Sequence, residues 1–416
     1  MKHVPALLLV LSLTLPASLA QRASELNPRS GLPNVLAKLA QGKDVRIAYL
    51  GGSITAAGGW RVLSLQWFQQ QFPQAHPTEI DAALSGTGST LGAFRIDHDV
   101  LRAHPDLVFV EFAVNDHGFK PEQVREAMEG IVRKIWRADP TTDICFIYTL
   151  NQDDLSALEP GNESYTSAAM EQVAKHYDIP SINFGVAVAK RVKEGTLLFK
   201  GQLPATIDPT QPMIFSGDGT HPYERTGHTL YLESFARSIN ALRAVGSIGP
   251  HLVPKPLDVH NLEIATVVPL TDVSHTGNWQ PVTLNDETDQ LPRSLPNVFA
   301  ASKPGDGLSF DFDGTLCGLY GVKGPDAAQF TVAIDRDTPI STTLFDSFST
   351  AHRYRIRPWF SPSLKPGHHH VVITIAGVVS NKEAILHAPT AGDPEFDRSV
   401  LYIGSILING TLLPTR

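Results

Sequence analysis

Cysteine is scarce in this chain, which has only Cys145 and Cys317 among its 416 residues. A small fold held together by several disulfides is therefore excluded. Both cysteines lie within apolar runs, where a free cysteine usually serves as a small hydrophobic side chain. A chain of this length can bury a large core, so we do not expect its fold to rely on a bridge between these two residues.

Surplus positive charge and long apolar runs are also missing. The chain has 34 Lys and Arg against 42 Asp and Glu, and its formal net charge is −8. Without surplus cations it is poorly suited to a phosphate backbone, so we expect no nucleic-acid partner. The apolar run at residues 7–15 is too short to cross a bilayer, and no other stretch is long enough. We therefore expect no membrane span.

The first 20 residues have the pattern of an export signal. Lys2 and His3 form a basic start, residues 7–15 form an apolar core, and residues 18–20 form a small-residue cleavage site. We expect a cleavable signal peptide over residues 1–20 and a secreted or periplasmic protein. The residue directly after Ala20 is Gln21 and not a cysteine, so the sequence does not indicate lipid attachment.

Short apolar runs alternate with helical patterns in the first half of the chain. This alternation is typical of βαβ units, and it predicts a three-layer α/β/α sandwich with a parallel sheet over residues 30–246. The expected strands are 45–50, 106–113, 143–150 and 180–184, and the expected helices begin at Pro121 and cover 164–177 and 224–242.

The composition changes after residue 246. Glycine and proline are frequent over residues 247–256, which we interpret as a stiff linker. Helical periodicity then disappears, and short β-rich runs are separated by Gly, Pro, Asp and Asn. The pattern predicts an all-β sandwich domain of jelly-roll character over residues 257–416. Its expected strands include 308–312, 329–334, 370–375 and 399–408.

Three polar segments follow expected strands or precede expected helices of the first domain. Gly51-Gly52-Ser53-Ile54-Thr55 places a hydroxyl directly after the first strand, at the edge where open α/β sheets bind ligands. Ser85-Gly86-Thr87-Gly88-Ser89 is a glycine-rich loop, and Asn115-Asp116 ends a buried strand. Each of these segments also fits an ordinary turn or helix start, because Gly, Ser, Asn and Asp favour both.

A fourth segment is more specific. In Gly217-Asp218-Gly219-Thr220-His221-Pro222, a carboxylate stands three residues before a histidine. On one loop, Asp218 can orient the imidazole of His221 through its Nδ1–H and leave Nε2 facing a nucleophile. The alternative is an Asp-Gly turn with a nearby structural histidine.

Taken together and in this order, the four segments resemble the SGNH (GDSL-like) hydrolase family, and the resemblance covers about residues 44–242. It implies a flavodoxin-like parallel sheet, Ser53 as the nucleophile, His221 as the general base and Asp218 as its partner. It also implies an oxyanion hole made of the backbone N–H groups of Ser53 and Gly86 and the side chain of Asn115. Gly88 is the alternative to Gly86. The chemistry needs no metal or cofactor.

The resemblance implies an esterase that forms an acyl-enzyme. By analogy with multi-domain carbohydrate esterases, export and an appended β-sandwich favour short acyl groups, O-acetyl above all, on a carbohydrate or polysaccharide. Alternatives are a lipid or aryl esterase, a sugar O-acyltransferase, and a carbohydrate-binding or assembly module without activity.

Two further patterns suggest metal ligands. We interpret residues 368–370, three consecutive histidines, as the start of a solvated strand, because neighbouring strand residues point to opposite faces. Residues 311–314 contain part of a calcium-loop pattern but not its remaining ligands, and we interpret them as a turn.

Overall fold

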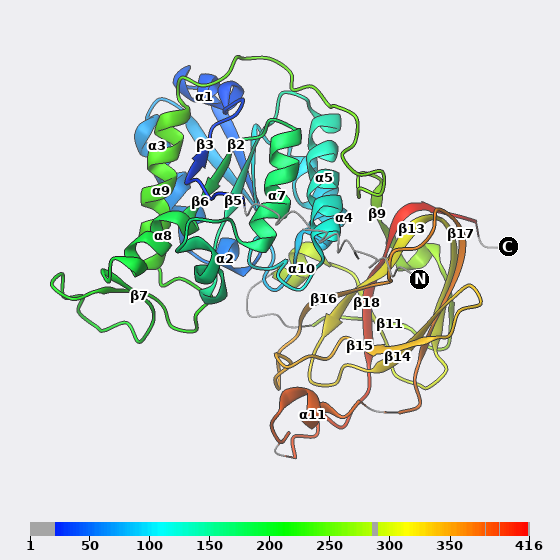
Figure 1. Ribbon diagram of the computed structural model, residues 1–416. Coiled ribbons are helices and arrows are strands. Elements are labelled where there is room, and N and C mark those ends of the chain that lie inside the picture. Colours follow the sequence, from blue (N-terminus) through cyan, green and yellow to red (C-terminus); the bar gives the residue numbers. More distant parts are fainter. Residues whose placement is uncertain (1–20, 285–289, 379, 391, 415–416) are drawn as a thin grey trace, which may run out of the picture.

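The computed structural model describes residues 21–284, 290–378, 380–390 and 392–414. The expected signal peptide, residues 1–20, lies outside this range. Figure 1 shows an α/β region and an all-β region side by side. Among the described helices, none is both long enough and apolar enough to cross a membrane.

The α/β region is built on a six-stranded sheet with the order β1-β6-β5-β4-β2-β3. All neighbouring strands are parallel except the short β1, which pairs antiparallel with β6 at one edge. The five parallel strands have the flavodoxin-like order, as predicted. The strands are β1 (Leu26–Asn27), β2 (Asp44–Gly51), β3 (His76–Ala83), β4 (Leu107–Glu111), β5 (Asp143–Tyr148) and β6 (Ser181–Asn183).

Helices cover both faces of this sheet, which confirms the three-layer prediction (Figure 1). Successive strand residues enter different cores: Val108 and Val110 of β4 pack toward one set of helices, and Leu107 and Phe109 toward the other. The first set is α4 (Ser89–Asp99), α5 (Pro121–Ala138) and α7 (Tyr165–His176). The second set is α1 (Pro33–Ala40), α3 (Trp60–Gln71), α8 (Phe184–Lys193) and α9 (Gly227–Leu242).

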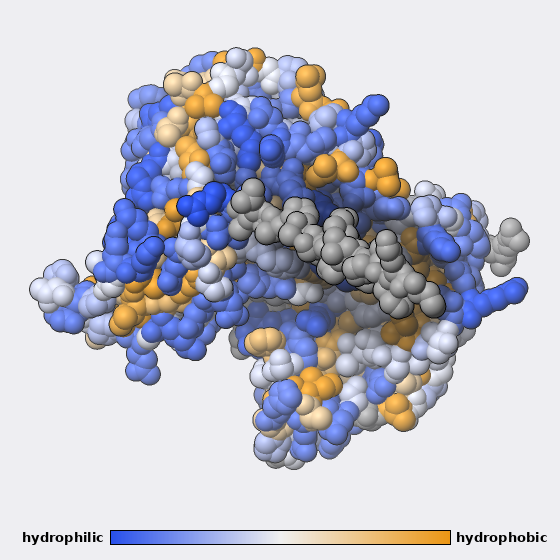
Figure 2. Space-filling model, viewed as in Figure 1, coloured by the Kyte–Doolittle hydropathy of each residue, from blue (hydrophilic) through white to orange (hydrophobic). Residues whose placement is uncertain are grey.

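Shorter elements complete the α/β region. Three of them lead into loops that contribute to the candidate active site described below. These are α2 (Ser53–Ala56), β7 (Leu197–Lys200) and β8 (Met213–Ser216). The last two strands form a small parallel sheet of their own, and Figure 2 shows a hydrophobic patch over this arm on an otherwise mostly hydrophilic face. The remaining short helix is α6 (Leu155–Leu158).

The C-terminal region is a ten-stranded antiparallel sheet. Its centre is the pairing of two long strands, β13 and β18, with register shifts at Gly314/Leu316 and Tyr320/Gly321. Such irregularities bend a strand, and the first half of β13 pairs with β17 while the second half pairs with β16. The all-β prediction is confirmed, and the jelly-roll arrangement in particular stays a prediction. The strands are β9 (Ala265–Pro269), β10 (Ser274–Thr276), β11 (Gln280–Val282), β12 (Val298–Ala301), β13 (Gly307–Lys323), β14 (Gln329–Ile334), β15 (Ile340–Thr343), β16 (Arg355–Phe360), β17 (Gly367–Ile375) and β18 (Leu401–Leu412).

Two interpretations of this region have different outcomes. The histidines 368–370 lie in strand β17 and alternate as expected: His368 and His370 lie near Asp311, whereas the Nδ1 of His369 lies 2.8 Å from Asp335 on the other face. The interpretation of residues 311–314 as a turn was wrong, because that segment pairs with β17 and continues the apolar alternation of β13. Cys145 and Cys317 are both buried and free.

The segment after α9 does not leave the α/β region at once. His251 stacks on Trp136 of α5, with ring centroids 4.8 Å apart, and its Nε2 lies 2.8 Å from Asp143 Oδ1. Farther on, Leu262 touches α5 so closely that a Cβ at Gly130 would lie 2.6 Å from its carbonyl carbon. Phe94 of α4 also stacks on Phe360 of β16 at 5.6 Å. The two regions therefore share a packed contact along α4 and α5.

A buried histidine of α9 makes the stability of this fold depend on pH. His228 is 1% exposed, and its Nδ1 accepts a hydrogen bond from the backbone N–H of Trp60 at 3.0 Å. Burial, with a smaller contribution from the charge of His221, lowers the pKa of His228 to about 4. An unfolded histidine titrates near 6.5. Between these values the unfolded chain binds more protons, so stability falls as pH decreases through that window.

We expect His228→Asn, which keeps an acceptor for Trp60 N–H, to lose less stability on acidification than the wild type. By the linkage relation the difference amounts to about 2 kcal/mol between pH 7 and pH 5. Urea denaturation at both pH values measures it. Equal losses in the two proteins would contradict the assignment.

Candidate active site

Three loops leave the sheet at the same edge. Gly51, the last residue of β2, pairs with Ala83 at the end of β3 and with Glu111 at the end of β4. The loops that follow these strands carry Ser53, Gly86 and Asn115, so three of the sequence-predicted residues start from neighbouring strand ends. This is the edge where ligands bind in open α/β sheets.

The structure joins Ser53, His221 and Asp218 in one hydrogen-bonded chain. Ser53 is the first residue of α2, and its Oγ lies 2.8 Å from His221 Nε2, although the two residues are 168 positions apart. His221 Nδ1 lies 2.7 Å from Asp218 Oδ2. The side chains of His221 and Asp218 are 50% and 58% exposed, so a substrate can reach them from solvent.

The loop between β8 and α9 orients the Asp218 carboxylate. Its Oδ1 accepts hydrogen bonds from the backbone N–H groups of Thr220 and His221, both at 2.8 Å, and from Ser216 Oγ at 3.0 Å. Gly219 adopts a φ of +88°, which favours glycine within this turn. Partial burial raises the pKa of Asp218, but the hydrogen bonds outweigh it and hold this pKa well below its usual range. The carboxylate is therefore ionised at neutral pH.

The loop after β3 exposes Gly86. Gly86 has a φ of +72°, and a Cβ built on it would meet nothing within 4 Å. The other candidate, Gly88, is packed: its Cβ would lie 2.3 Å from Asp116 Oδ1. Of the two glycines, Gly86 is thus the one that faces open space.

Asn115 lies against the loop of the serine. A Cβ at Gly52 would lie 1.9 Å from Asn115 Oδ1, so this close approach requires glycine before Ser53. Asn115 Oδ1 is buried and has no hydrogen-bond partner among the described residues. The structure therefore places the Asn115 amide beside the N-terminus of α2.

A buried carboxyl below the serine was missed by sequence reasoning. Glu111 ends β4, and its carboxyl accepts hydrogen bonds from Thr55 Oγ1 at 2.7 Å and from Thr149 Oγ1 at 2.6 Å. Burial raises the pKa of Glu111, against the effect of these hydroxyls. The hydrogen bond from Thr55 to Glu111 connects helix α2 to the end of strand β4. The signal in the sequence was an acidic residue inside an otherwise apolar run.

A second histidine-carboxylate pair lies on the loops after β4 and β5. His117 Nε2 is 3.0 Å from Asp154 Oδ1, and the hydrogen bond with Asp154 raises the pKa of His117. Its neighbour Asp116 is buried, which raises the pKa of that carboxyl to about 7. Asp116 Oδ1 accepts the backbone N–H of Ser89 at 2.9 Å and so connects this loop to the start of α4.

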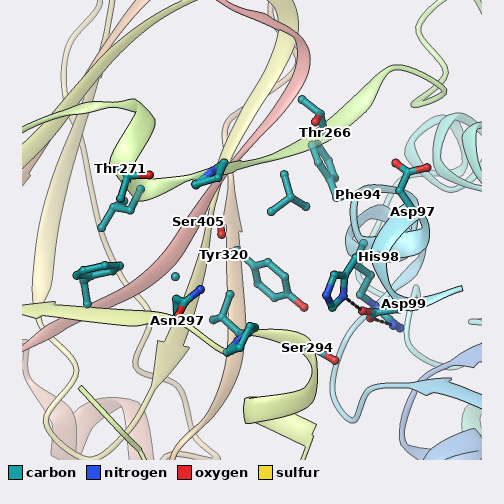
Figure 3. Close-up of a pocket in the computed structure, with 18 residues that line it drawn as sticks. Phe94, Asp97, His98, Asp99, Thr266, Thr271, Ser294, Asn297, Tyr320 and Ser405 are labelled. Atoms are coloured by element: carbon teal, nitrogen blue, oxygen red, sulfur yellow. Dashed lines mark hydrogen bonds and ion pairs between the residues drawn. The ribbon is translucent and has the colours of Figure 1, made fainter. Parts of the chain in front are cut away.

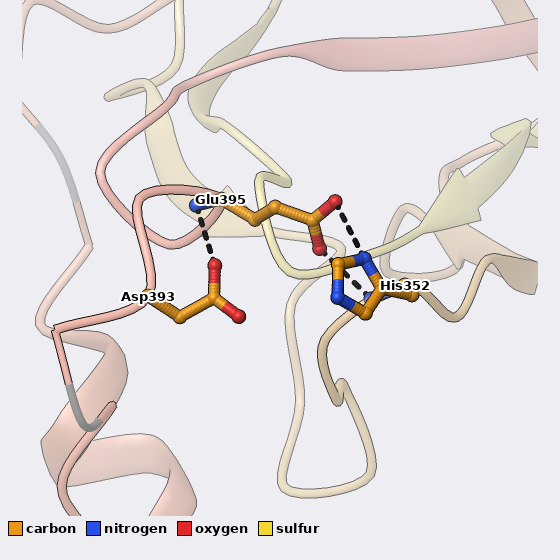
Figure 4. Close-up of side chains that lie close together, drawn as sticks. All are labelled: His352, Asp393 and Glu395. Atoms are coloured by element: carbon orange, nitrogen blue, oxygen red, sulfur yellow. Dashed lines mark hydrogen bonds and ion pairs between the residues drawn. The ribbon is translucent and has the colours of Figure 1, made fainter.

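Among the described residues, one group of three could offer ligands to a metal. Figure 4 shows His352, Asp393 and Glu395 close together in the C-terminal region. The Glu395 carboxylate accepts a hydrogen bond from the backbone N–H of His352 at 2.8 Å and lies 3.0 Å from His352 Nδ1. Glu395 therefore already has a structural role, since it fixes the backbone and the ring of His352. The group is separate from the Ser53 chain.

A cavity of about 660 Å³ lies between α4 and the C-terminal sheet. Figure 3 shows Phe94, His98 and Asp99 on its α4 side and Tyr320 and Asn297 across from them. Ser53, Asp218 and His221 do not line it. The cavity is therefore distinct from the serine site.

Comparisons with known proteins bear on the family and the fold of this chain. Residues 49–225 match the model of the GDSL-like Lipase/Acylhydrolase family. No curated protein matches the chain.

Solved structures are similar to this chain to different extents. One is a two-domain esterase, CEX, active on acetylated mannans and co-crystallised with mannopentaose. It is 20% identical, covers 94% of this chain and 98% of its own, and superposes with a TM-score of 0.71. A catalytic mutant of Axe2, an acetylxylan esterase from Geobacillus stearothermophilus, is 16% identical over 47% of this chain and 94% of its own, with a TM-score of 0.37.

The family match spans the segments that carry Ser53, Gly86, Asn115, Asp218 and His221. The likeness to CEX extends over both regions of the chain. Residues 49–225 therefore form a domain that matches the GDSL-like lipase/acylhydrolase family, and the protein is a carboxylic ester hydrolase.

Proposed function

We propose that this protein is a secreted serine esterase that removes short acyl groups, above all O-acetyl, from a carbohydrate or polysaccharide. The observation that carries the catalytic part of the proposal is the chain from Ser53 Oγ through His221 to Asp218, at 2.8 and 2.7 Å. A serine hydroxyl is a weak nucleophile at neutral pH, so it needs a neutral imidazole within hydrogen-bond reach. His221 Nε2 lies within that reach of Ser53 Oγ.

The reaction proceeds through an acyl-enzyme. As Ser53 Oγ attacks the ester carbonyl carbon, His221 Nε2 takes the hydroxyl proton, and Asp218 stabilises the imidazolium without becoming protonated. The tetrahedral intermediate collapses when the bond to the sugar oxygen breaks, and His221 returns the proton to that oxygen. A water molecule then repeats the sequence on the acyl group and restores Ser53.

Three donors stabilise the oxyanion that forms on the carbonyl oxygen. These are the backbone N–H groups of Ser53 and Gly86 and the side chain of Asn115. Their loops leave adjacent strand ends, Gly86 faces open space and Asn115 lies against Gly52. Losing one such donor typically lowers kcat about 100- to 1000-fold. This chemistry uses no metal or cofactor.

The substrate class is proposed from the two-domain architecture. CEX shares the arrangement over nearly its whole length and is active on acetylated mannans. We propose the same division here, with a catalytic domain over residues 30–246, a linker over 247–256 and an accessory β domain over 257–416. Secretion rests on the signal-peptide pattern of residues 1–20.

Ser53→Ala removes the nucleophile and should lower kcat for p-nitrophenyl acetate by at least about 10⁴-fold, since the residues of such a triad act as a unit. Ser156→Ala, at an exposed position on α6, is the matched control and should keep full activity. Initial rates and urea unfolding curves of both variants measure this. Unchanged turnover in a folded Ser53→Ala protein would refute the proposal.

Acetate release from a panel of acetylated mannan, xylan and bacterial polysaccharides tests the substrate class. We expect release from at least one polysaccharide, and a steep fall in kcat/KM from acetyl to decanoyl p-nitrophenyl esters. Higher kcat/KM with longer chains would instead favour a lipid or aryl esterase. Transfer of acetyl to an added sugar, in preference to water, would favour an O-acyltransferase.

A further inference from the structure

The loop that carries Gly86 is held at three points. In its middle, Thr87 Oγ1 donates to the carbonyl oxygen of Leu84 at 2.8 Å. At its end, the backbone N–H of Ser89 donates to Asp116 Oδ1 at 2.9 Å. At its start, the backbone N–H of Ser85 donates to Gln290 Oε1 at 2.9 Å. The third contact differs from the others, because Gln290 comes from the C-terminal region.

Gln290 begins a short helix, α10 (Gln290–Ser294), that lies between β11 and β12 in the sequence. Figure 1 shows this helix against the α/β region. Arg293 of the same helix donates to Asp81 Oδ2 at 2.8 Å and to the carbonyl oxygen of Ala83 at 2.6 Å. The helix thus contacts both the end of β3 and Ser85 of the loop that follows.

The contact between α10 and the loop is close. The 2.9 Å between the Ser85 nitrogen and Gln290 Oε1 is the separation of an ordinary direct N–H···O hydrogen bond. A water-mediated bridge is therefore not what joins them, and the Gln290 amide itself fixes the Ser85 N–H.

Gly86 depends on such neighbours for its orientation. Glycine populates positive and negative φ almost equally, and a Cβ at Gly86 would touch nothing within 4 Å. Nothing at the residue itself therefore selects its φ of +72°. The peptide plane that carries its N–H is the plane between Ser85 and Gly86, and the Gln290 bond acts on the residue that starts this plane.

We propose that Gln290 is a positioning residue for the esterase reaction: it holds the Ser85–Gly86 segment so that the Gly86 N–H points at the oxyanion. The inference rests on the proposed function, in which Gly86 is an oxyanion donor. It makes the C-terminal region part of the catalytic apparatus through one hydrogen bond. A misaimed donor weakens binding of the transition state more than binding of the ester, so the effect falls on kcat.

Three variants of the full chain test this with p-nitrophenyl acetate. Gln290→Leu has a similar size and no acceptor, and we expect kcat to fall roughly 10-fold with KM within about 2-fold. Gln290→Glu keeps an oxygen for the Ser85 N–H and should restore kcat to within about 2-fold of wild type. Ser294→Ala is the control, because Ser294 lies on the same helix but lines the interdomain cavity (Figure 3). Its kcat should not change.

The outcomes separate this inference from the proposed function. Wild-type kcat in a folded Gln290→Leu protein would overturn the inference, as would an equal loss in the Leu and Glu variants or a change confined to KM. Should Gln290→Leu fail to fold, Gln290→Ala is judged by the same criteria. Ser53→Ala, assayed alongside, loses activity if the function is right. If it retains activity, the proposed function itself fails.

Discussion

The hydrogen bond between Ser53 Oγ and His221 Nε2 connects residues that are 168 positions apart, so it forms only when the whole α/β region has folded. The parallel sheet brings the serine to one edge, because β2 ends at Gly51 and the chain must turn there. The small sheet of β7 and β8 brings the loop of His221 to the same place. Polar contacts then limit the movement of both sides: buried Glu111 accepts a hydrogen bond from Thr55 of α2, and the exposed Asp218 accepts three hydrogen bonds from residues 216–221.

The C-terminal sheet contacts this machinery in two different ways. Along α4 and α5 the contact is broad, with Phe94 stacked on Phe360, and it leaves a cavity of about 660 Å³. At α10 the contact consists of hydrogen bonds from two side chains, and it reaches the loop of Gly86. The first kind of contact stabilises the pairing of the two regions, whereas the second acts on the end of β3 and on Ser85 of the loop that follows. By the proposed role of Gln290, the C-terminal region influences the reaction without offering a side chain to the ester.

Much of the α/β region could be predicted, because strands buried on both faces are continuous apolar runs and its helices have regular apolar spacing. Strand β3 was missed: it lies at a sheet edge, and His76, Thr78 and Glu79 are exposed. The candidate site residues could be predicted because their segments are short and ordered along the chain. Gln290 could not be found that way, since its partner lies 205 positions away and α10 has only five residues. Tertiary contacts, and not local pattern, give that helix its place.

Covalent labelling with a fluorophosphonate is the most direct test of the central claim, that Ser53 is activated by His221. The reagent forms a bond from phosphorus to a nucleophilic serine oxygen and releases fluoride. Peptide mass spectrometry should find a single adduct on the peptide that contains Ser53, and the adduct should be lost in His221→Ala. An adduct on another residue, or labelling of Ser53 at the wild-type rate without His221, would contradict the account.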